Sequence, residues 1–546
     1  MNSYRPGIFG VVLFLTPLAL AQNVATRSYD NTRSGANPYE TILTKANVSG
    51  GKFGKLFTVD LDGEVYAQPL YMSKLSISGG THNVVFVATM NNSVYALDAD
   101  SGKLLWKETF GTPIVTSAVQ ESEHPNINND SPTGILSTPV IDPDTDTMYF
   151  VHASETKSGS TTSYAFSLEA IDVRTGAKVS GSPVTVTGTY QTADLSTPLQ
   201  FNAKVENQRP SLALANGNVY IAFSSHNDAG DYHGWIFAYS ASTLDRVAAF
   251  ADTTIGSAGG IWMAGSGPSV DSDGNIYIST GNGSFGVTPN ELEQTGNSFI
   301  KLSPTLALLD YFTPYNSAAM NAIDEDLGAS GLLLIPDPNN AATTKYVLGG
   351  GKGGMLYLTS ASNMGGFDSK KDDVVQEFQA VYGSGTSHVH GTPIYFNAPA
   401  TGPTVYVWGE NDTLREFRFD SASGTIITTP YATSAMTAPV THANSAMPGG
   451  FLCLTANGTS DRILWASTPY NGSAEEANVQ GVLYAFNPVT LKVLWSDKTN
   501  DARDEIGMFA KDVPPVVVNG KLYMVNFGKL GTTGAAGQLV VYGLLP

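Results

Sequence analysis

The sequence has a single cysteine among its 546 residues, Cys453, which lies in the apolar segment FLCLTANG. One cysteine cannot form an internal disulfide, so packing alone must hold the fold together. A lone cysteine in an apolar strand usually behaves as a small hydrophobic residue. We therefore expect Cys453 to be buried and unreactive.

Charged residues are also scarce, at 14% of the chain, and positive charge is the scarcest. The 29 Lys and Arg residues form no run and are outnumbered by 48 Asp and Glu residues, which gives a net charge of −19. Binding to nucleic acid or to anionic lipid needs clustered basic side chains that neutralise phosphates. The composition therefore predicts that neither is a partner.

Long apolar runs are absent except near the start. Residues 8–20 are apolar, Arg5 precedes them, and Ala19-Leu20-Ala21 offers small residues for cleavage. This pattern is typical of a secretory signal peptide, and the run is too short for a membrane span. We predict a signal peptide over residues 1–21 and a secreted protein, periplasmic or extracellular. No cysteine follows the cleavage site, so we expect no lipid anchor.

Glycine, in contrast, is abundant, and turn-rich repeats recur along the chain. YALDADSGKLLW at 95–106 returns as LEAIDVRTGAKV at 168–179 and as YAFNPVTLKVLW at 484–495. Each copy predicts a strand, a polar turn and a second strand, and most copies follow another strand–turn–strand pattern such as PSVDSDGNIYIST. Each unit therefore supplies four strands.

Eight such units align, about 64 residues apart. The aligned positions are Ala96, Ala170, Ala238, Lys301, Tyr357, Glu416, Ala485 and Val541. Four-stranded units repeated in this way predict an all-β fold, a single eight-bladed β-propeller. The eighth unit has three clear strands, and the orphan strand at 51–61 is expected to complete it and close the ring. We expect an arm over 22–50 and the propeller over 51–546.

Two residues in the turns have open interpretations. Asn282, in STGNGSFG, is either a turn former or a ligand in a buried pocket, because asparagine closes turns on its own backbone. Lys352, between glycines in GGGKGG, is either a solvated side chain or directed into the central channel.

Histidines and acids form two further candidate clusters. His388 and His390 in SHVHG would share one face of a strand, a chelating geometry, although no third ligand is near in sequence. The second cluster is either a metal site or a solvated loop. It contains His226, Asp228, Asp231 and His233.

The unit length and the A-x-D-x-x-T-G-x-x-x-W pattern resemble the quinoprotein alcohol dehydrogenase-like superfamily. Its members are eight-bladed propellers, and some bind pyrroloquinoline quinone (PQQ) with Ca²⁺. The resemblance covers nearly all of the mature chain. The repeat pattern is shared with non-catalytic propellers such as the barrel-assembly lipoprotein, so it specifies the fold and not the activity.

A more specific resemblance lies in GSAGGIWMAGSGPSVDSDGNIYISTGNGSFG, residues 256–286. It is similar to the dehydrogenase segment that carries a Trp under the quinone and a Ca²⁺-binding Asn, which implies these roles for Trp262 and Asn282. GGGKGGMLYLT resembles the strand whose Lys faces the quinone oxygens, which implies that role for Lys352. Asp228 and Asp231 are the acids nearest to the place of the Ca²⁺-binding Glu.

The chain also departs from that pattern. The vicinal cysteine pair of those dehydrogenases is absent, and the place of their catalytic aspartate, after Thr313-Pro314, holds Tyr315-Asn316. An amide cannot accept a substrate proton as a carboxylate does. Asp324 or Asp326 would take that role only if the loop differs.

Two functions therefore stay open. One is a PQQ- and Ca²⁺-dependent dehydrogenase of alcohols or sugars, in which Lys352, Asp324 and Asp326 act in catalysis. The other is a non-catalytic propeller that binds a protein or a glycan on one rim.

Overall fold

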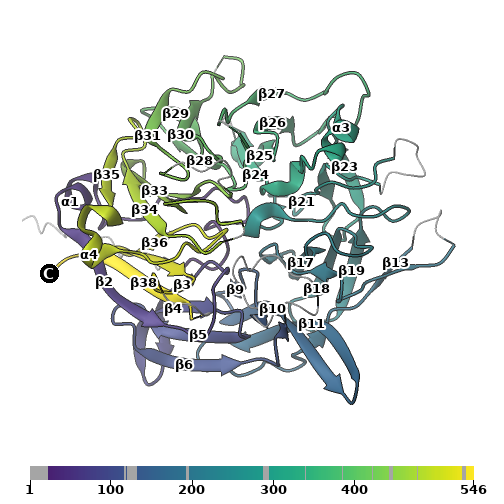
Figure 1. The fold of residues 1–546 in the computed structure, drawn as a ribbon, viewed down its shortest axis with the longest axis horizontal. Helices are drawn as coiled ribbons and strands as arrows, with labels where there is room; N and C mark the ends of the chain where they lie inside the picture. The colour runs from purple at the N-terminus through teal and green to yellow at the C-terminus, as the bar shows by residue number, and fades with distance from the viewer. Residues whose placement is uncertain are drawn as a thin grey trace, which may run out of the picture.

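Eight antiparallel sheets, each with four main strands, surround a central axis in the computed structural model (Figure 1). The structure describes residues 22–546 apart from 116–118, 120–131, 192–195, 287–293, 338–339, 384, 421, 442–446, 476 and 532–535. The predicted signal peptide lies outside the described residues. The predicted all-β, eight-bladed propeller is confirmed.

The first four blades follow one another along the chain, each from its innermost to its outermost strand. Their strands are β3 (Leu70–Ile77), β4 (Gly80–Ala88), β5 (Ser93–Asp98) and β6 (Leu104–Thr109); β9 (Val140–Asp142), β10 (Thr147–Ser158), β11 (Thr161–Asp172) and β12 (Val184–Thr185); β16 (Ala213–Ala215), β17 (Asn218–Ser225), β18 (Trp235–Ser240) and β19 (Arg246–Ala251); and β20 (Ser269–Val270), β21 (Ile276–Ser279), β22 (Phe299–Leu302) and β23 (Leu308–Phe312).

The last four blades repeat this order. Their strands are β24 (Leu333–Asp337), β25 (Asn340–Gly350), β26 (Met355–Ser360) and β27 (Gln376–Gln379); β28 (Ile394–Ala398), β29 (Gly402–Val407), β30 (Thr413–Arg418) and β31 (Ala432–Thr437); β32 (Phe451–Asn457), β33 (Ser460–Pro469), β34 (Gly481–Phe486) and β35 (Val493–Ser496); and β36 (Val516–Val518), β37 (Lys521–Asn526), β38 (Gln538–Leu544) and β2 (Phe53–Asp60).

Helices are short and lie in the connections. They are α1 (Lys45–Ser49), α3 (Ser317–Ala322) and α4 (Asp501–Asp504), with 3₁₀ turns η1 (Met263–Gly265), η2 (Leu327–Ala329) and η3 (Asp497–Asn500). Among the described residues, none of these helices has the length and apolar content needed to cross a bilayer.

The repeat alignment matches the blades position by position. All eight aligned residues, from Ala96 in β5 to Val541 in β38, lie in the third strand of their blades. The turn after this strand is closed by side chains, as in the first blade, where Asp98 accepts from the backbone and hydroxyl of Ser101. The regular spacing of these polar turns along the sequence therefore marks where the third strand of each blade ends.

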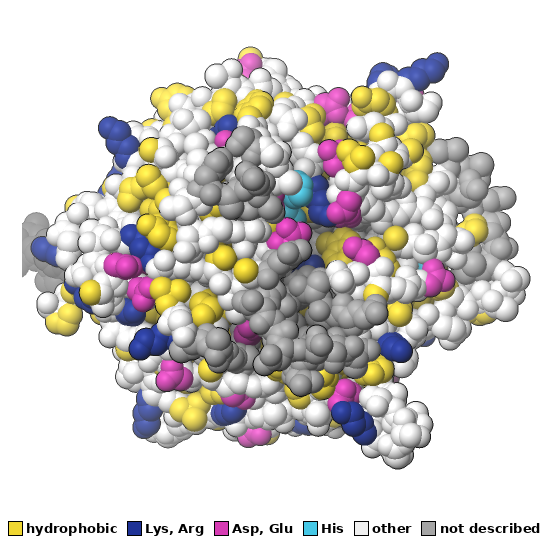
Figure 2. All heavy atoms as spheres, in the orientation of Figure 1, with side chains coloured by type: hydrophobic (Ala, Val, Ile, Leu, Met, Phe, Trp, Pro, Cys, Tyr) yellow, Lys and Arg dark blue, Asp and Glu magenta, His cyan; other side chains and the backbone are white. Residues whose placement is uncertain are grey.

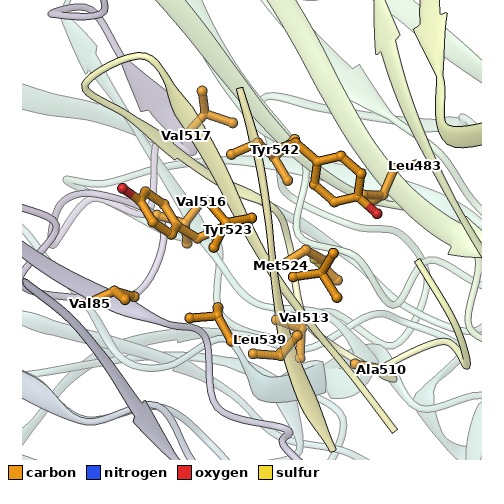
Figure 3. Close-up of a cluster of buried hydrophobic side chains, with 14 of the residues drawn as sticks. Val85, Leu483, Ala510, Val513, Val516, Val517, Tyr523, Met524, Leu539 and Tyr542 are labelled. Atoms are coloured by element: carbon orange, nitrogen blue, oxygen red, sulfur yellow. The ribbon is translucent and has the colours of Figure 1, made fainter. Parts of the chain in front are cut away.

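The core is divided into layers between neighbouring blades. Successive residues of a strand face opposite sides, so Val219 and Ile221 pack towards the second blade while Tyr220 and Ala222 pack towards the fourth. Both faces of each middle strand are buried, so nearly all of its residues are apolar. This explains the near-continuous hydrophobic runs in the sequence. Figure 3 shows one such layer, with Tyr523 and Leu539 of the last blade beside Val85 of the first.

The ring is closed by the N-terminal strand β2, as the sequence predicts. It pairs antiparallel with β38 and forms the outermost strand of the eighth blade (Figure 1). Phe53 is fully buried, with its ring centroid 5.4 Å from that of Trp465 and 5.0 Å from that of Trp495. Residues from opposite ends of the chain thus share one apolar cluster.

The arm that precedes β2 contacts the innermost strand of every blade. Val24 exchanges backbone hydrogen bonds with Tyr71, and β1 (Ala36–Asn37) pairs in parallel with β32. Between these ends the arm bonds the remaining inner strands in turn, at Ile141, Leu214, Val270, Leu334, Tyr395 and Val517. The arm is therefore a structural part of the ring, which the sequence did not reveal.

Candidate functional site

The loops that precede the inner strands of blades four, five and six gather polar side chains. Trp262 lies before β20, Asp324 and Asp326 before β24, and His388 and His390 before β28. Figure 2 shows histidine, basic and acidic side chains close together near the middle of the face in view. The site is thus built from loops of different blades that meet only because the ring closes.

Asn282 is held in place through both its backbone and its side chain. Its backbone N–H donates to Asp326 Oδ1 over 2.7 Å, and its side-chain N–H donates to Asp324 Oδ1 over 2.9 Å. Its Oδ1 accepts from Asn297 Nδ2 over 2.8 Å. The backbone of Asn282 is not in the left-handed region, so the residue is not there to form a positive-φ turn.

Two further asparagines, which the sequence did not single out, support Asn282. Asn297 Nδ2 also donates to Asn321 Oδ1 over 2.7 Å, and Asn297 Oδ1 accepts from the N–H of Leu327 over 2.8 Å. Asn321 Nδ2 donates to the carbonyl of Gly283 over 2.8 Å. This network fixes the 281–283 turn against the loop that carries Asp326.

Lys352 is directed into the site and lies between two carboxylates. Its Nζ is 2.6 Å from Asp326 Oδ2 and 2.8 Å from Asp324 Oδ2. Its side chain is 16% exposed, against 72% for Asp324 and 11% for Asp326. Burial lowers the pKa of Lys352, but the two carboxylates raise it by more, so its pKa is above the ordinary value. Lys352 is therefore a fixed cation in this arrangement.

Two glycines permit this close approach. A Cβ at Gly281 would overlap Asp326 Oδ1 and the Trp262 ring, and a Cβ at Gly351 would overlap the carbonyl of Asp326. The N–H of Lys352 donates to that same carbonyl over 2.9 Å. Gly281 of the GNG turn and Gly351 of GGGKGG are thus required, because any larger residue at either position would collide with Asp326.

Trp262 is half-buried beside the cluster. The guanidinium of Arg209 lies 5.5 Å from its ring centroid, and the ring of Tyr232 meets it edge-on at 6.1 Å and 76°. Arg209 in turn pairs with the buried Asp512 over 3.1 Å. Met263 and Ala264, which follow Trp262, both have positive φ, which is strained for residues with a Cβ. The indole is therefore held by a charged pair and an aromatic edge.

The structure brings Asp228, but not Asp231, towards this cluster. Asp228 Oδ1 accepts from the Tyr232 hydroxyl over 2.5 Å. Burial raises the pKa of Asp228, and the charges of Asp326 and Asp324 raise it further, so Asp228 lies within electrostatic reach of these two carboxylates. Asp231 is exposed, and its charge acts instead on Glu206 and His233.

The predicted histidine clusters have different outcomes. His226 stacks on Phe166, with ring centroids 6.4 Å apart, and His233 Nδ1 faces the carbonyl of Thr253 at 3.2 Å, so these two do not converge on Asp228. His388 and His390 lie in a loop, so the prediction of a strand there is wrong. They nevertheless do converge, on Glu410, which the sequence did not identify.

Asn316, which occupies the expected place of the catalytic aspartate, lies at the start of α3. Its carbonyl accepts from the N–H groups of Ala319 and Met320. The neighbouring N–H of Tyr315 donates to Asp372 over 2.6 Å. The carboxylates beside Lys352 belong to Asp324 and Asp326, eight and ten positions further along the chain.

Comparisons with known proteins agree with this architecture. Residues 62–298 match a family model described as outer membrane protein assembly factor BamB. No curated protein matches the sequence. Three similar solved structures are alcohol or methanol dehydrogenases, at 13–15% identity.

The first of these is the quinohemoprotein alcohol dehydrogenase ADHIIG from Pseudomonas putida HK5, with a TM-score of 0.59, 14% identity, and 96% of this chain and 80% of that chain covered. The second is the quinohemoprotein alcohol dehydrogenase from Comamonas testosteroni, with a TM-score of 0.57, 15% identity, and 96% and 82% covered. The third is a europium-containing methanol dehydrogenase, with a TM-score of 0.54, 13% identity, and 96% and 98% covered. The likeness to these structures shows the fold of the chain, an eight-bladed β-propeller.

Proposed function

We propose that this protein is a PQQ- and metal-dependent oxidoreductase that acts on an alcohol or a sugar. The observation that carries the proposal is the cluster of Lys352, Asp326 and Asn282 beside Trp262, joined by contacts of 2.6 and 2.7 Å. Secretion, expected from residues 1–21, is part of the same proposal.

The residues present fit such a cofactor in their chemistry. Trp262 offers a flat aromatic surface, and the glycines at 281 and 351 let the loop that carries Asp326 lie close beside it. Asn282 Oδ1 and the carboxylate of Asp228 are oxygen donors of the kind that Ca²⁺ prefers. We expect these two to hold the metal ion and Trp262 to lie against the quinone.

In the proposed reaction, one side chain of the protein would accept the substrate proton and another would stabilise the negative charge that develops. When bound, PQQ would supply the acceptor for a hydride from the carbon of the alcohol. Asp326 accepts the hydroxyl proton, because it is a carboxylate held in position by the N–H of Asn282. Lys352, as a fixed cation, stabilises negative charge that develops on an oxygen nearby.

The experiment is reconstitution of the purified full chain with PQQ and Ca²⁺. We expect the quinone absorbance to stay with the protein on desalting, and dye-linked oxidation of one or more members of an alcohol and sugar panel. Lys352→Ala is expected to abolish oxidation. Lys498→Ala is the matched control, because Lys498 also lies between two acids, Asp497 and Asp501, and is 17% exposed. Failure of the unsubstituted chain to retain quinone would refute the proposal.

A second candidate function is that of a non-catalytic scaffold. It is favoured by the match of residues 62–298 to the BamB family model, and by the fact that Lys352 Nζ is already paired with two carboxylates. On this interpretation the cluster only ties blades four and five together. Lys352→Ala would then lower the thermal stability of the protein, which would bind no quinone.

A further inference from the structure

We infer that His388, His390 and Glu410 form a binding site for a divalent transition-metal ion of the Zn²⁺ type, separate from the oxygen donors around Asn282. Their ligand atoms all lie within 4.8 Å of one another. In the described part of the chain they are the one group of three histidine, cysteine or acidic side chains that meets this criterion.

The distances match those within a metal coordination shell. His388 Nδ1 is 3.3 Å from Glu410 Oε2, and His390 Nε2 is 3.2 Å from Glu410 Oε1. Ligands about 2.0–2.1 Å from a tetrahedral Zn²⁺ ion are separated by about 3.3 Å from one another. The three side chains therefore need little rearrangement to bind one ion.

The facing atoms are buried and contact one another without good hydrogen-bond geometry. Glu410 is 1% exposed and His390 is 4% exposed. Among the described residues, both histidines lie 3.2–3.3 Å from Glu410 as ion pairs, but His388 Nδ1, His390 Nε2 and Glu410 Oε1 make no well-formed hydrogen bond. Unsatisfied polar atoms are rare in buried positions because each one costs about 1–3 kcal/mol. A cation among the three would accept a lone pair from each of them.

The backbone around the three ligands is fixed by three neighbouring segments. The N–H of Glu410 donates to the carbonyl of His388 over 2.9 Å, and the N–H of Val389 donates to that of Gly351 over 3.0 Å. Asn411, next to Glu410, donates from its side chain to the carbonyl of Thr386 over 3.0 Å. Such support holds metal ligands in position before the ion binds.

The donor set selects the kind of ion. Two imidazoles and one carboxylate suit Zn²⁺ and its neighbours in the first transition row, whereas Ca²⁺ prefers oxygen ligands alone. Three protein ligands leave a fourth position for water or an anionic oxygen. The His388 side chain is 22% exposed while its Nδ1 is buried, so the site lies just beneath the surface. The site also adjoins Lys352, through the contact of Val389 with Gly351.

The test is metal binding by the purified full chain after treatment with a chelator. We expect one Zn²⁺ ion per chain by elemental analysis, and visible absorption from bound Co²⁺ typical of low coordination number. His388→Ala and Glu410→Gln are each expected to weaken Zn²⁺ binding at least tenfold. His82→Ala is the matched control, because His82 pairs with Asp98 over 2.6 Å but has no third ligand.

Zn²⁺ should also raise the melting temperature of the unsubstituted chain and of His82→Ala, but not that of His388→Ala, because binding to the native state stabilises it. His388→Ala decides the outcome if Glu410→Gln does not fold, since His388 is partly exposed. Lys352→Ala should keep its Zn²⁺, which separates this site from the proposed quinone site. The absence of stoichiometric Zn²⁺, or equal affinity in His388→Ala and the control, would overturn the inference.

Discussion

Lys352 and Asp326 are joined twice, through their side chains and through their backbones. The ammonium lies 2.6 Å from Asp326 Oδ2, and the N–H of Lys352 donates to the carbonyl of Asp326 over 2.9 Å. The pair links the loop before β24 to the turn between β25 and β26. The pair therefore holds the connection between blades four and five against blade five.

The first prediction follows from this pair. Asp326→Asn keeps the shape of the side chain but cannot accept a proton, so it should lower turnover about 10²- to 10⁴-fold, the usual contribution of a general base. Quinone retention should change much less. Steady-state kinetics of the reconstituted protein measures the first effect and desalting the second. Asp501→Asn, at an exposed residue beside Lys498, is the control. Unchanged turnover would exclude Asp326 as the base.

The second prediction concerns the glycine of the GNG turn. Gly281→Ala places a methyl group against Asp326 Oδ1 and the Trp262 ring, so we expect quinone binding to be lost and stability to fall by about 1–3 kcal/mol. Gly353→Ala is the control, because its Cβ would meet only Glu325, at 3.7 Å. Urea denaturation of both variants checks the difference in stability. Equal stabilities would contradict the packing argument.

The third prediction concerns ring closure by β2. Phe53→Ala removes a fully buried ring between Trp465 and Trp495, and should cost about 3–5 kcal/mol of unfolding free energy. Phe57→Ala, on the same strand but half-buried, should cost less. Denaturant midpoints of the two variants give the comparison. A smaller loss for Phe53→Ala than for Phe57→Ala would show that the closing strand is held by other contacts.

The fourth prediction concerns Cys453, which is buried as the sequence indicates. Burial raises the pKa of its thiol to about 12, so the reactive thiolate is almost absent near neutral pH. We expect no reaction with a thiol reagent in the native protein and complete reaction in denaturant. Rapid native labelling would contradict both the burial and the raised pKa.

The fifth prediction concerns the pH dependence of stability. Burial raises the pKa of Asp497 to about 7 in the folded protein, while its unfolded value is about 4. Between these values the folded state keeps a proton that the unfolded state has released. The contribution of Asp497 to stability is therefore full below about pH 4 and is lost as pH rises to about 7.

Asp497→Asn should remove this loss. Asp497 accepts hydrogen bonds from the backbone N–H groups of Leu483 and Ile506, and an asparagine can accept only one of them. The variant should therefore be less stable than the unsubstituted protein at low pH, but its stability should depend less on pH. Urea midpoints across the acidic range measure the slope. Asp501→Asn, at a 54% exposed neighbour, should keep the slope of the unsubstituted protein. Identical slopes for Asp497→Asn and the unsubstituted chain would contradict the assignment.

The site was only partly predictable from sequence. Trp262, Asn282 and Lys352 lie near one another, as a local resemblance suggests. Asp324 and Asp326 lie beside Lys352, although the resemblance pointed to the Asn316 position, and Asp228 is the one of the two nearest acids that lies towards them. Asn297, Asn321, Arg209 and Asp512 were missed, because single polar residues in turn-rich loops carry no distinctive pattern. Glu410 was missed for the same reason, although it follows His390 by only twenty positions.

The amino-acid sequence by itself determined the blade count, the third strand of each blade and the closing role of β2, because each depends on short apolar strands and turn formers that recur along the chain. Only the tertiary structure decided that Asp326 rather than the Asn316 position lies beside Lys352, and that Glu410 faces both His388 and His390. Asn282 and Asp326, for instance, are 44 positions apart and come from different blades. Contacts of this kind form when the ring closes and loops from separate blades meet, and no local pattern in the chain encodes that meeting.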